Sequence, residues 1–367
     1  MRLALVIDSI DAWETGTEQH IGRLIRALNP SLFEPELYFL RPSTGHLTFP
    51  CRVHLAGTRP VVKWYRPETL IRLVRLFRER RPHVVQTFFR DSTYYGITAA
   101  RIAGIPARVI SVRNTGYWMS APDRVVSRIV GRWAAGYQCN SRAASDWLQA
   151  TERVPRDRIT ILHNALDLKR ISPATAAVRT AARTELGIPV DAPVVLSVAS
   201  LRPVKDLQTL IDAAAIVETE LPAAQFLLLG DGPDRERLAA QIRRHDLDDS
   251  VHLAGSQSDI RPYLAAADLA VLTSKSEASS NAVLEYLAAG LPAILSDIPA
   301  NRELVDEVLF PPGDARQLGH QILSLWRDPA RRSYLGRKNR QRASQHNLEG
   351  FSKLAQDYYL GLAEAYS

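Results

Sequence analysis

The 367-residue chain has only two cysteines, Cys51 and Cys139, and their positions match no metal-binding or redox motif. A reducing compartment such as the cytosol is the simplest setting for such a chain. No stretch approaches the roughly 20 consecutive apolar residues that span a bilayer. The N-terminal run MRLALVIDSIDAWE is too short for the apolar region of a signal peptide and has no small-residue cleavage site. It is therefore expected to form a first core strand.

Several functional motifs are also missing. No G-x-G-x-x-G follows the first expected strand, which argues against a nicotinamide-dependent oxidoreductase, and the P-loop pattern is absent. No Asp-x-Asp pair with supporting ligands is present, so any chemistry on a phosphate is expected to proceed without a metal ion or cofactor. The formal net charge of +7 suits anionic ligands or membrane surfaces and does not by itself indicate nucleic acid.

Length and composition predict a soluble globular protein of two domains. The length exceeds that of a typical single core, and 46% hydrophobic with 23% charged residues is an ordinary globular composition. Short apolar runs alternate with amphipathic segments from end to end, which predicts parallel sheets with helices on both faces. We expect two doubly wound, Rossmann-like α/β domains at 1–170 and 171–345, with a linker in Leu168–Pro193. A C-terminal helix at 346–367 is expected to pack back on the first domain.

In open parallel sheets, ligands bind beyond the carboxyl ends of the strands, so residues that directly follow strands are the candidates for a site. The expected strands are Leu3–Ile7, Glu36–Leu40, Val84–Thr87, Arg108–Val112, Tyr137–Asn140, Ile159–Leu162, Val194–Val198, Gln225–Leu229, Val251–Leu253, Leu269–Leu272 and Ala293–Leu295. The expected helices include Glu18–Leu28, Pro67–Arg80, Leu207–Glu218, Asp234–Arg244 and Phe351–Ala365.

Two glutamates, Glu277 and Glu285, follow the expected strand Leu269–Leu272 and are separated by seven residues. Ser and Asn are good N-cap residues, so a helix should begin around Ser279–Asn281, leaving Glu277 in the loop and Glu285 inside the helix. Across a wholly helical segment the two Cα atoms would lie roughly 12 Å apart, which suits the two ends of an extended ligand. The helix N-terminus between them suits a phosphate. The alternative is an ordinary surface helix with a solvated acidic face.

The other strand ends of the second half also carry loops compatible with a ligand. Lys205 stands at the start of a helix, where its ammonium can meet a diphosphate, although a solvated surface lysine is the alternative. Gly230 and Gly232 form a turn that allows close backbone approach, and Gly255 lies in a third small-residue turn. Four such loops in succession are less probable by chance than any one of them.

The order of these loops resembles a known family. The segments Ser-Leu-Arg-Pro-Val-Lys, Leu-Leu-Gly-Asp-Gly-Pro, His-Leu-Ala-Gly-Ser and Ser-Glu-Ala-Ser-Ser-Asn-Ala-Val-Leu-Glu are similar, in that order, to those of the retaining glycosyltransferases of family 4. That family has the GT-B fold, in which two Rossmann-like domains face a central cleft. The likeness covers essentially the whole chain and is strongest from about Val194 to Val305.

The resemblance implies that the second domain binds a nucleotide-sugar donor such as a UDP- or GDP-sugar. It implies that Glu285 holds the ribose hydroxyls, Glu277 contacts the donor sugar and Lys205 meets the diphosphate. The donor-binding residues it implies are Gly16, Ser200, Arg202, Lys205, Gly230, Gly232, Gly255, Ser279, Ser280, Asn281 and Glu285. Two positions depart from the family pattern: Ser200 stands where relatives usually have arginine, and Ala278 where they usually have glycine. Whether Arg202 replaces the missing arginine stays open.

In the first domain, Gly16 lies in a loop similar to the one that faces the diphosphate in the family, although a plain turn before a helix is an equal alternative. Many relatives carry a histidine at a strand end near the donor sugar, and this sequence has none. Asp91, Arg113 and Asn114 are the polar groups there, and Arg113 and Asp91 join Glu277 and Lys205 as the candidate catalytic residues. The segment from His163 to Asp167 resembles the family's Asn-Gly-x-Asp turn and is expected to be structural.

The resemblance implies transfer of a hexosyl unit, with retention at the anomeric carbon, to a glycan, a lipid-linked molecule or a small acceptor. Two other functions remain open: a sugar-nucleotide epimerase of the same architecture and a non-catalytic sugar-nucleotide-binding protein. A glycosidase is disfavoured because its carboxylates face one bond about 5 to 9.5 Å apart.

A basic amphipathic stretch, Lys63-Trp64-Tyr65-Arg66 with the helix Leu70–Arg80, suggests a peripheral contact with the inner face of an anionic membrane. The alternative is a helix that packs on the core and has a basic outer face.

Overall fold

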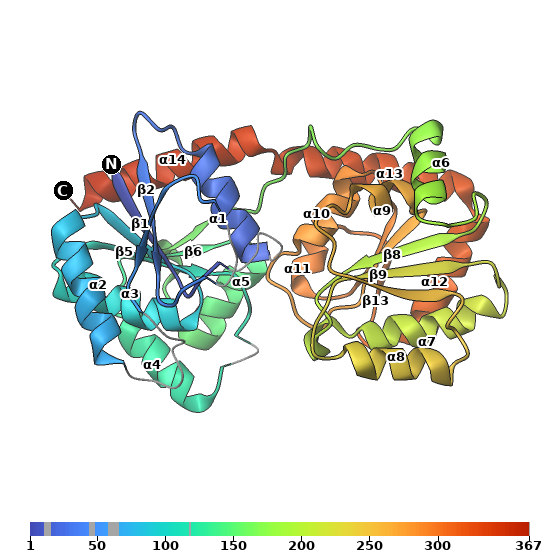
Figure 1. The fold of residues 1–367 in the computed structure, drawn as a ribbon, viewed down its shortest axis with the longest axis horizontal. Coiled ribbons are helices and arrows are strands. Elements are labelled where there is room, and N and C mark those ends of the chain that lie inside the picture. Colours follow the sequence, from blue (N-terminus) through green and yellow to red (C-terminus); the bar gives the residue numbers. More distant parts are fainter. Residues whose placement is uncertain (11–15, 44–47, 58–65, 117–118, 367) are drawn as a thin grey trace. The chain divides into compact units, whose positions relative to one another are not determined.

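The computed structural model describes residues 1–10, 16–43, 48–57, 66–116 and 119–366. The chain divides into two compact units: unit 1 comprises Met1–Ala165 and Leu348–Ser367, and unit 2 comprises Leu166–Asn347. Figure 1 shows each unit as a twisted sheet with helices packed on its faces. Among the described residues, no helix is both long and apolar enough to cross a membrane.

The described part of unit 1 contains a seven-stranded parallel sheet in the order β3-β2-β1-β4-β5-β6-β7. Its strands are β1 (Arg2–Ile7), β2 (Glu34–Phe39), β3 (Arg52–Leu55), β4 (Val84–Thr87), β5 (Ala107–Val112), β6 (Gly136–Cys139) and β7 (Ile159–Ile161). Its helices are α1 (Gly16–Ala27), α2 (Pro67–Arg80), α3 (Arg90–Ile102), α4 (Ala121–Gly131), α5 (Arg142–Trp147) and α14 (Leu348–Ala365). The strand order reverses between β1 and β4, which is the point where ligands bind in open α/β sheets.

The two faces of this sheet have separate cores because side chains alternate along each strand. Leu3, Leu5 and Ile7 of β1 pack in one cluster with α1 and α14, whereas Ala4 and Val6 pack in another with α2 and α3. The final helix therefore completes the core of the unit that begins the chain. A buried hydrogen bond ties it to the sheet, since the Tyr359 hydroxyl donates to Gln86 Oε1 over 2.5 Å.

Unit 2 contains a six-stranded parallel sheet in the order β10-β9-β8-β11-β12-β13. Its strands are β8 (Val194–Val198), β9 (Gln225–Leu229), β10 (Val251–Gly255), β11 (Leu269–Leu272), β12 (Ala293–Ser296) and β13 (Leu309–Phe310). Its helices are α6 (Ala176–Glu185), α7 (Leu207–Glu218), α8 (Arg235–Arg244), α9 (Arg261–Ala266), α10 (Asn281–Ala288), α11 (Pro299–Arg302), α12 (Ala315–Arg327) and α13 (Pro329–Ala343). Here the strand order reverses between β8 and β11.

All the strands expected from the sequence are present, and the expected doubly wound α/β class is confirmed. The linker expected within Leu168–Pro193 is wrong, because this segment contains α6 and belongs to unit 2. The Arg183 side chain of α6 is buried and donates to Asp268 Oδ2 over 2.8 Å and to Ala266 O over 3.0 Å. The chain passes between the units after Ala165 and again after Asn347, a few residues from the boundaries expected at 170 and 345.

Candidate functional site

The carboxyl edge of the second sheet gathers the residues expected to bind a donor. The loops after β8 and β11 leave the sheet at its reversal point, and they carry Lys205 and Glu277. Lys205 ends a single 3₁₀ turn, Pro203–Lys205, and Glu277 lies in the loop before α10. Sequence reasoning placed both residues at strand ends, and the structure brings their side chains into direct contact.

Lys205 and Glu277 form a short ion pair. Lys205 Nζ donates to Glu277 Oε1 over 2.5 Å, and the Ser274 hydroxyl donates to the same oxygen over 2.7 Å. The side chains are 20% and 11% exposed, so the pair is largely shielded from water yet still reachable. The two candidate residues neutralise each other in this structure, so a lysine that meets a diphosphate must share or give up this carboxylate.

A second set of contacts holds the two loops together. The Thr273 hydroxyl donates to Lys205 O over 2.7 Å, and Lys275 N donates to Val204 O over 2.9 Å. Lys275 Nζ also donates to Asp206 Oδ1 over 2.9 Å. Asp206 is buried and has a φ of 49°, a left-handed conformation that turns the chain from the 3₁₀ turn into α7. These contacts fix the position of the Lys205 backbone.

Helix α10 begins where the sequence predicted. Ser280 is the N-cap, and its hydroxyl accepts from Val283 N over 3.4 Å, so the protein itself caps one N–H group of the first turn. Ser279 and Asn281 flank this cap. The buried Tyr286 hydroxyl accepts from Val198 N over 2.6 Å, which ties the helix to the end of β8. Glu285 lies inside the helix and is largely buried at 9% exposed.

The glycines at the strand ends have structural reasons of their own. A Cβ at Gly230 would lie 2.0 Å from Ala199 O, and one at Gly232 would lie 2.4 Å from Leu201 O. Their φ angles are 129° and 157°, so both the close approach and the conformation favour glycine. Because both positions lack a side chain, the backbone of the loop after β8 can approach them closely. Gly255 has a φ of 71° with open space around it, so its conformation alone favours glycine.

The two departures from the family pattern lie on the same edge. Ser200 and Arg202 are both exposed in the loop after β8, and Arg202 N donates to Ser200 O over 2.8 Å. The exposed arginine is three residues before Lys205 on one tight loop. Ala278 is buried and is not among the described residues with positive φ, so its methyl group introduces no backbone strain.

In unit 1, two carboxylates lie at the reversal point of the sheet. Asp8 follows β1, and its Oδ1 accepts from Ser92 N at the start of α3 over 3.0 Å. Burial, with a smaller contribution from the charge of Asp91, raises the pKa of Asp8 to about 6. Asp91 accepts from Arg90 Nε over 2.8 Å. Asp8 was missed in the sequence, although the strand-end rule that found Asp91 points to it as well.

The residue before α3 is unusual. Phe89 has φ 68° and ψ 174°, and its side chain is 38% exposed. A bulky residue with positive φ is rare, and nothing in the sequence signals it. The Ser92 and Thr93 hydroxyls donate to Phe89 O over 3.3 and 2.6 Å, which holds the conformation in place. An exposed aromatic ring thus stands beside the acidic pair at the edge of the sheet.

Arg113 follows β5 and is a half-buried cation of this edge. Its Nη2 donates to Asn164 Oδ1 over 2.6 Å, whereas its buried Nη1 has no hydrogen-bond partner. Burial, with the nearby charge of Arg23, lowers the pKa of Arg113 to about 9. His20 on α1 is buried beside it, and desolvation, with the charge of Arg113, lowers the pKa of His20 so that the ring is neutral. Gly16 begins α1 on the same unit.

The structure thus brings Lys205, Glu277 and the start of α10 together in unit 2, and places Asp91 and Arg113 at the sheet edge of unit 1. Lys63, Trp64 and Tyr65 lie outside the described residues. Within the part of the chain that is described, no group of three or more His, Cys, Asp or Glu side chains is arranged to hold a metal ion.

Two protein-family models match this chain, one in each half. Residues 15–170 match the model described as Glycosyltransferase Family 4, and residues 178–342 match that of Glycosyl transferases group 1. The chain is a glycosyltransferase of the group 1 and family 4 type. Both the sequence resemblance to family 4 and the expected GT-B fold are thereby confirmed.

Similar proteins include two bacterial glycosyltransferases. The lipopolysaccharide core biosynthesis glycosyltransferase LpsE of Rhizobium meliloti is 36% identical over 140 residues, which cover 38% of this chain and 40% of LpsE. An Escherichia coli enzyme named UDP-Gal:alpha-D-GlcNAc-diphosphoundecaprenol alpha-1,3-galactosyltransferase is 28% identical over 65% of this chain and 64% of its own. The chain thus spans less than two thirds of the length of these relatives.

Solved structures match over nearly the whole chain. The Anabaena protein HepE, crystallised with UDP and glucose, has a TM-score of 0.85 at 19% identity and covers 97% of this chain and 98% of its own. Sucrose-phosphate synthase from Thermosynechococcus elongatus has a TM-score of 0.84 at 22% identity, with 99% of both chains covered. At these identities the structural match establishes the fold.

Proposed function

We propose that this glycosyltransferase moves a hexosyl unit from a nucleotide sugar, a UDP- or GDP-sugar, to a glycan or lipid-linked acceptor, with retention at the anomeric carbon and without a metal ion. The observation that carries the proposal is the meeting of Lys205, Glu277 and the start of α10 at the reversal point of the second sheet. A cation, a sugar-binding carboxylate and a helix N-terminus on one edge match the three parts of such a donor.

The donor residues take distinct roles in this proposal. Lys205 and the N–H groups near Ser279–Asn281 stabilise the charge of the departing diphosphate, with exposed Arg202 as a second cation on the same loop. Glu277 accepts hydrogen bonds from the sugar hydroxyls, and Glu285 accepts from the ribose hydroxyls. The glycine-bearing loops at Gly230, Gly232 and Gly255 shape the edge beside them, and Ser200 lines it.

In the transfer step, the bond between the anomeric carbon and the phosphate oxygen breaks, and its electron pair stays on the diphosphate. The acceptor oxygen bonds to the anomeric carbon from the same face, and its proton passes to the leaving phosphate oxygen. These fixed cationic and N–H groups take the place of a divalent cation, which is why no metal is needed.

The proposed acceptor side is unit 1, where Asp91 and Arg113 are the polar candidates, and Gly16 of the same unit is assigned to donor binding. Arg113 carries an unpartnered buried Nη1 and therefore favours a nearby negative charge. The bound UDP in HepE and the lipid-linked acceptor in the name of the Escherichia coli relative support a uridine donor and a lipid-linked acceptor here. We place the enzyme in the cytoplasm, in peripheral contact with the inner face of the membrane.

A thermal-shift screen of UDP-, GDP- and ADP-sugars tests the donor assignment. One nucleotide should raise the melting temperature of the protein, equally with EDTA and with Mg²⁺. Replacing Glu285 with Ala should abolish that shift, because the ribose hydroxyls lose their acceptor. A shift that survives unchanged in this variant would remove the ribose assignment. Release of the nucleotide only when an acceptor is added would distinguish a transferase from an epimerase or a binding protein.

A further inference from the structure

The net positive charge of this protein comes from one of its two units. Unit 1 contains 25 Lys and Arg against 16 Asp and Glu, a formal net charge of +9, whereas unit 2 contains 21 against 23, a net charge of −2. Within unit 1, residues 66–132 alone hold 13 basic and 4 acidic residues. This segment contains α2, α3 and α4, which hold eight of these basic residues and all four acidic ones, and Arg81 and Arg132 directly follow α2 and α4.

These three helices lie side by side. α2 packs on α3 and α3 packs on α4, as Figure 1 shows. The apolar side of α2 faces the core, where Leu73, Val74 and Phe77 are buried, so this helix alone does not form a lipid-binding amphipathic helix. Its outer side remains exposed and basic.

Helix α4 presents a different pattern. Val125 and Ile129 stand one turn apart and are 58% and 45% exposed, while the buried anchor of the helix is Val130. Arg124, Arg128 and Arg132, also one turn apart, are exposed directly beside them. An apolar stripe next to a row of arginines is the arrangement by which an interfacial helix inserts into lipid headgroups.

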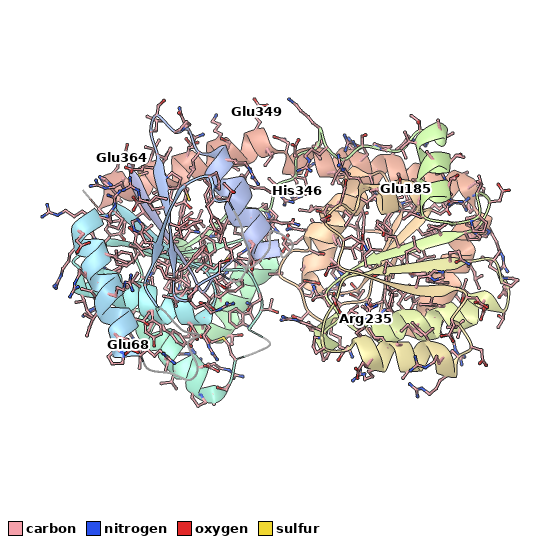
Figure 2. The ribbon with its side chains drawn as sticks, viewed as in Figure 1. Glu68, Glu185, Arg235, His346, Glu349 and Glu364 are labelled. Carbon is pink, nitrogen blue, oxygen red and sulfur yellow. The ribbon has the colours of Figure 1, made fainter. Side chains whose placement is uncertain are left out.

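We define the basic face by the exposed residues of α2, α3 and α4 and of the positions that directly follow α2 and α4. Its large apolar members are Ile71, Ile102, Val125 and Ile129, and its arginines are Arg72, Arg75, Arg78, Arg81, Arg90, Arg101, Arg124, Arg128 and Arg132. The exposed carboxylates of α2 are Glu68, labelled in Figure 2, and Glu79.

Part of this charge is not neutralised by the protein. Within the described part of the chain, no carboxylate forms an ion pair with Arg72, Arg75, Arg124 or Arg132. Arg128 donates to Thr151 O over 2.9 Å and lies 3.9 Å from Glu152, a weak pair. Unpaired arginines around exposed aliphatic side chains complement a surface that is both anionic and apolar beneath.

We propose that the basic face of unit 1 binds the surface of an anionic phospholipid bilayer, with Val125 and Ile129 inserted between headgroups and the surrounding arginines against lipid phosphates. A nucleic acid would satisfy the arginines but offers no apolar layer for the aliphatic side chains, which is why the lipid is favoured. The inference rests on the proposed function in that a lipid-linked acceptor lies in the same surface.

Co-sedimentation of the full chain with vesicles tests this surface. The protein should bind vesicles of phosphatidylcholine with 30% phosphatidylglycerol at low salt, and bind pure phosphatidylcholine vesicles far more weakly. Arg124→Gln with Arg132→Gln should lower the partition coefficient roughly 30-fold, because each arginine near an anionic surface contributes about fivefold. The matched control is Arg237→Gln with Arg243→Gln, which removes two exposed arginines from unit 2 and should change nothing.

The aliphatic pair separates lipid from a general polyanion. Val125→Ser with Ile129→Ser should lower binding to anionic vesicles at least about tenfold while leaving its salt dependence unchanged, since only apolar contact is lost. Vesicle binding that is unaffected by this change, together with equal retention on a polyphosphate resin, would overturn the lipid assignment. Absence of binding to anionic vesicles at 50 mM salt would overturn it too.

Donor binding keeps this test independent of the proposed function. Every variant should retain the thermal shift produced by the nucleotide sugar, which also shows that it is folded. Loss of vesicle binding with an intact donor shift refutes only the basic face. A wild-type protein that binds vesicles but responds to no nucleotide sugar would refute the proposed function and leave the basic face standing.

Discussion

Because Lys205 and Glu277 form an ion pair, removing the charge of Glu277 should have opposite effects on diphosphate binding and on sugar transfer. In the structure, Glu277 Oε1 accepts from Lys205 Nζ over 2.5 Å and from the Ser274 hydroxyl over 2.7 Å. Changing Glu277 to Gln keeps the shape and an acceptor for Ser274 but removes the charge. Lys205 is then free to bind a diphosphate without first leaving a carboxylate.

The magnitude follows from the burial of the pair. Exposed ion pairs contribute about 0–1 kcal/mol, and breaking buried ones costs about 3–5 kcal/mol. With side chains 20% and 11% exposed, this pair falls between, at about 1–2 kcal/mol. The Gln variant should therefore unfold at a lower temperature and bind the nucleoside diphosphate roughly 5- to 30-fold more tightly. Transfer should fall by more than about 100-fold, because the charged acceptor for the sugar hydroxyls is lost.

Isothermal titration with the nucleoside diphosphate, and acceptor-dependent release of that diphosphate, measure the two effects. Glu236→Gln is the matched control, since it removes one exposed carboxylate from α8 of the same unit. Weaker diphosphate binding in the Glu277 variant would refute the competition between carboxylate and phosphate. Full transfer activity would refute the sugar-binding role.

Three further changes test the framework of the two sheets. A carboxyl whose pKa is raised on folding stabilises the fold while it is protonated, so the wild type should lose up to about 3 kcal/mol of unfolding free energy as the pH rises from about 4 to 6. Asp8→Asn should show no such decrease, and urea unfolding at pH 4.5 and 7 measures the difference. A variant that follows the wild-type pH profile would contradict this. Gly230→Ala should unfold unit 2 or lower its stability by more than about 3 kcal/mol, since the new methyl carbon would lie 2.0 Å from Ala199 O; a soluble variant with an unchanged melting temperature would disprove the close approach. Tyr286→Phe should cost about 1–3 kcal/mol, because the Val198 N–H loses its buried acceptor, and should weaken donor binding in the same titrations; a neutral effect on stability would contradict that hydrogen bond's role.

The fold could be predicted from the sequence because its signals are local. Apolar runs gave every core strand of the two sheets, and the Ser280 cap gave the start of α10. Two strands were missed for local reasons as well: Arg52–Leu55 is a polar edge strand, and Leu309–Phe310 is only two residues long. Edge and very short strands lack the apolar run by which buried strands are recognised.

The errors concern contacts between distant residues. The segment containing α6 resembled a linker because it is rich in small and charged residues, yet Arg183 reaches Asp268, 85 residues later, to bury its charge. The strand-end rule predicted that Lys205 and Glu277, 72 residues apart, lie at the same edge of the sheet, but it did not predict their ion pair. The positive φ of Phe89 could not be anticipated, because no residue type there signals it.

The packing of α14 has a consequence for how the chain is made. Phe351, Ala355 and Tyr359 fill the cluster formed by β1 and α1, so the first unit has a gap in its core until α14 has left the ribosome. Unit 2 ends at Asn347 and has all its strands before α14 is synthesised. The unit that is translated first is thus the last to have all its helices and strands. A nascent chain halted before Leu348 exposes apolar side chains of α1 that a chaperone would recognise.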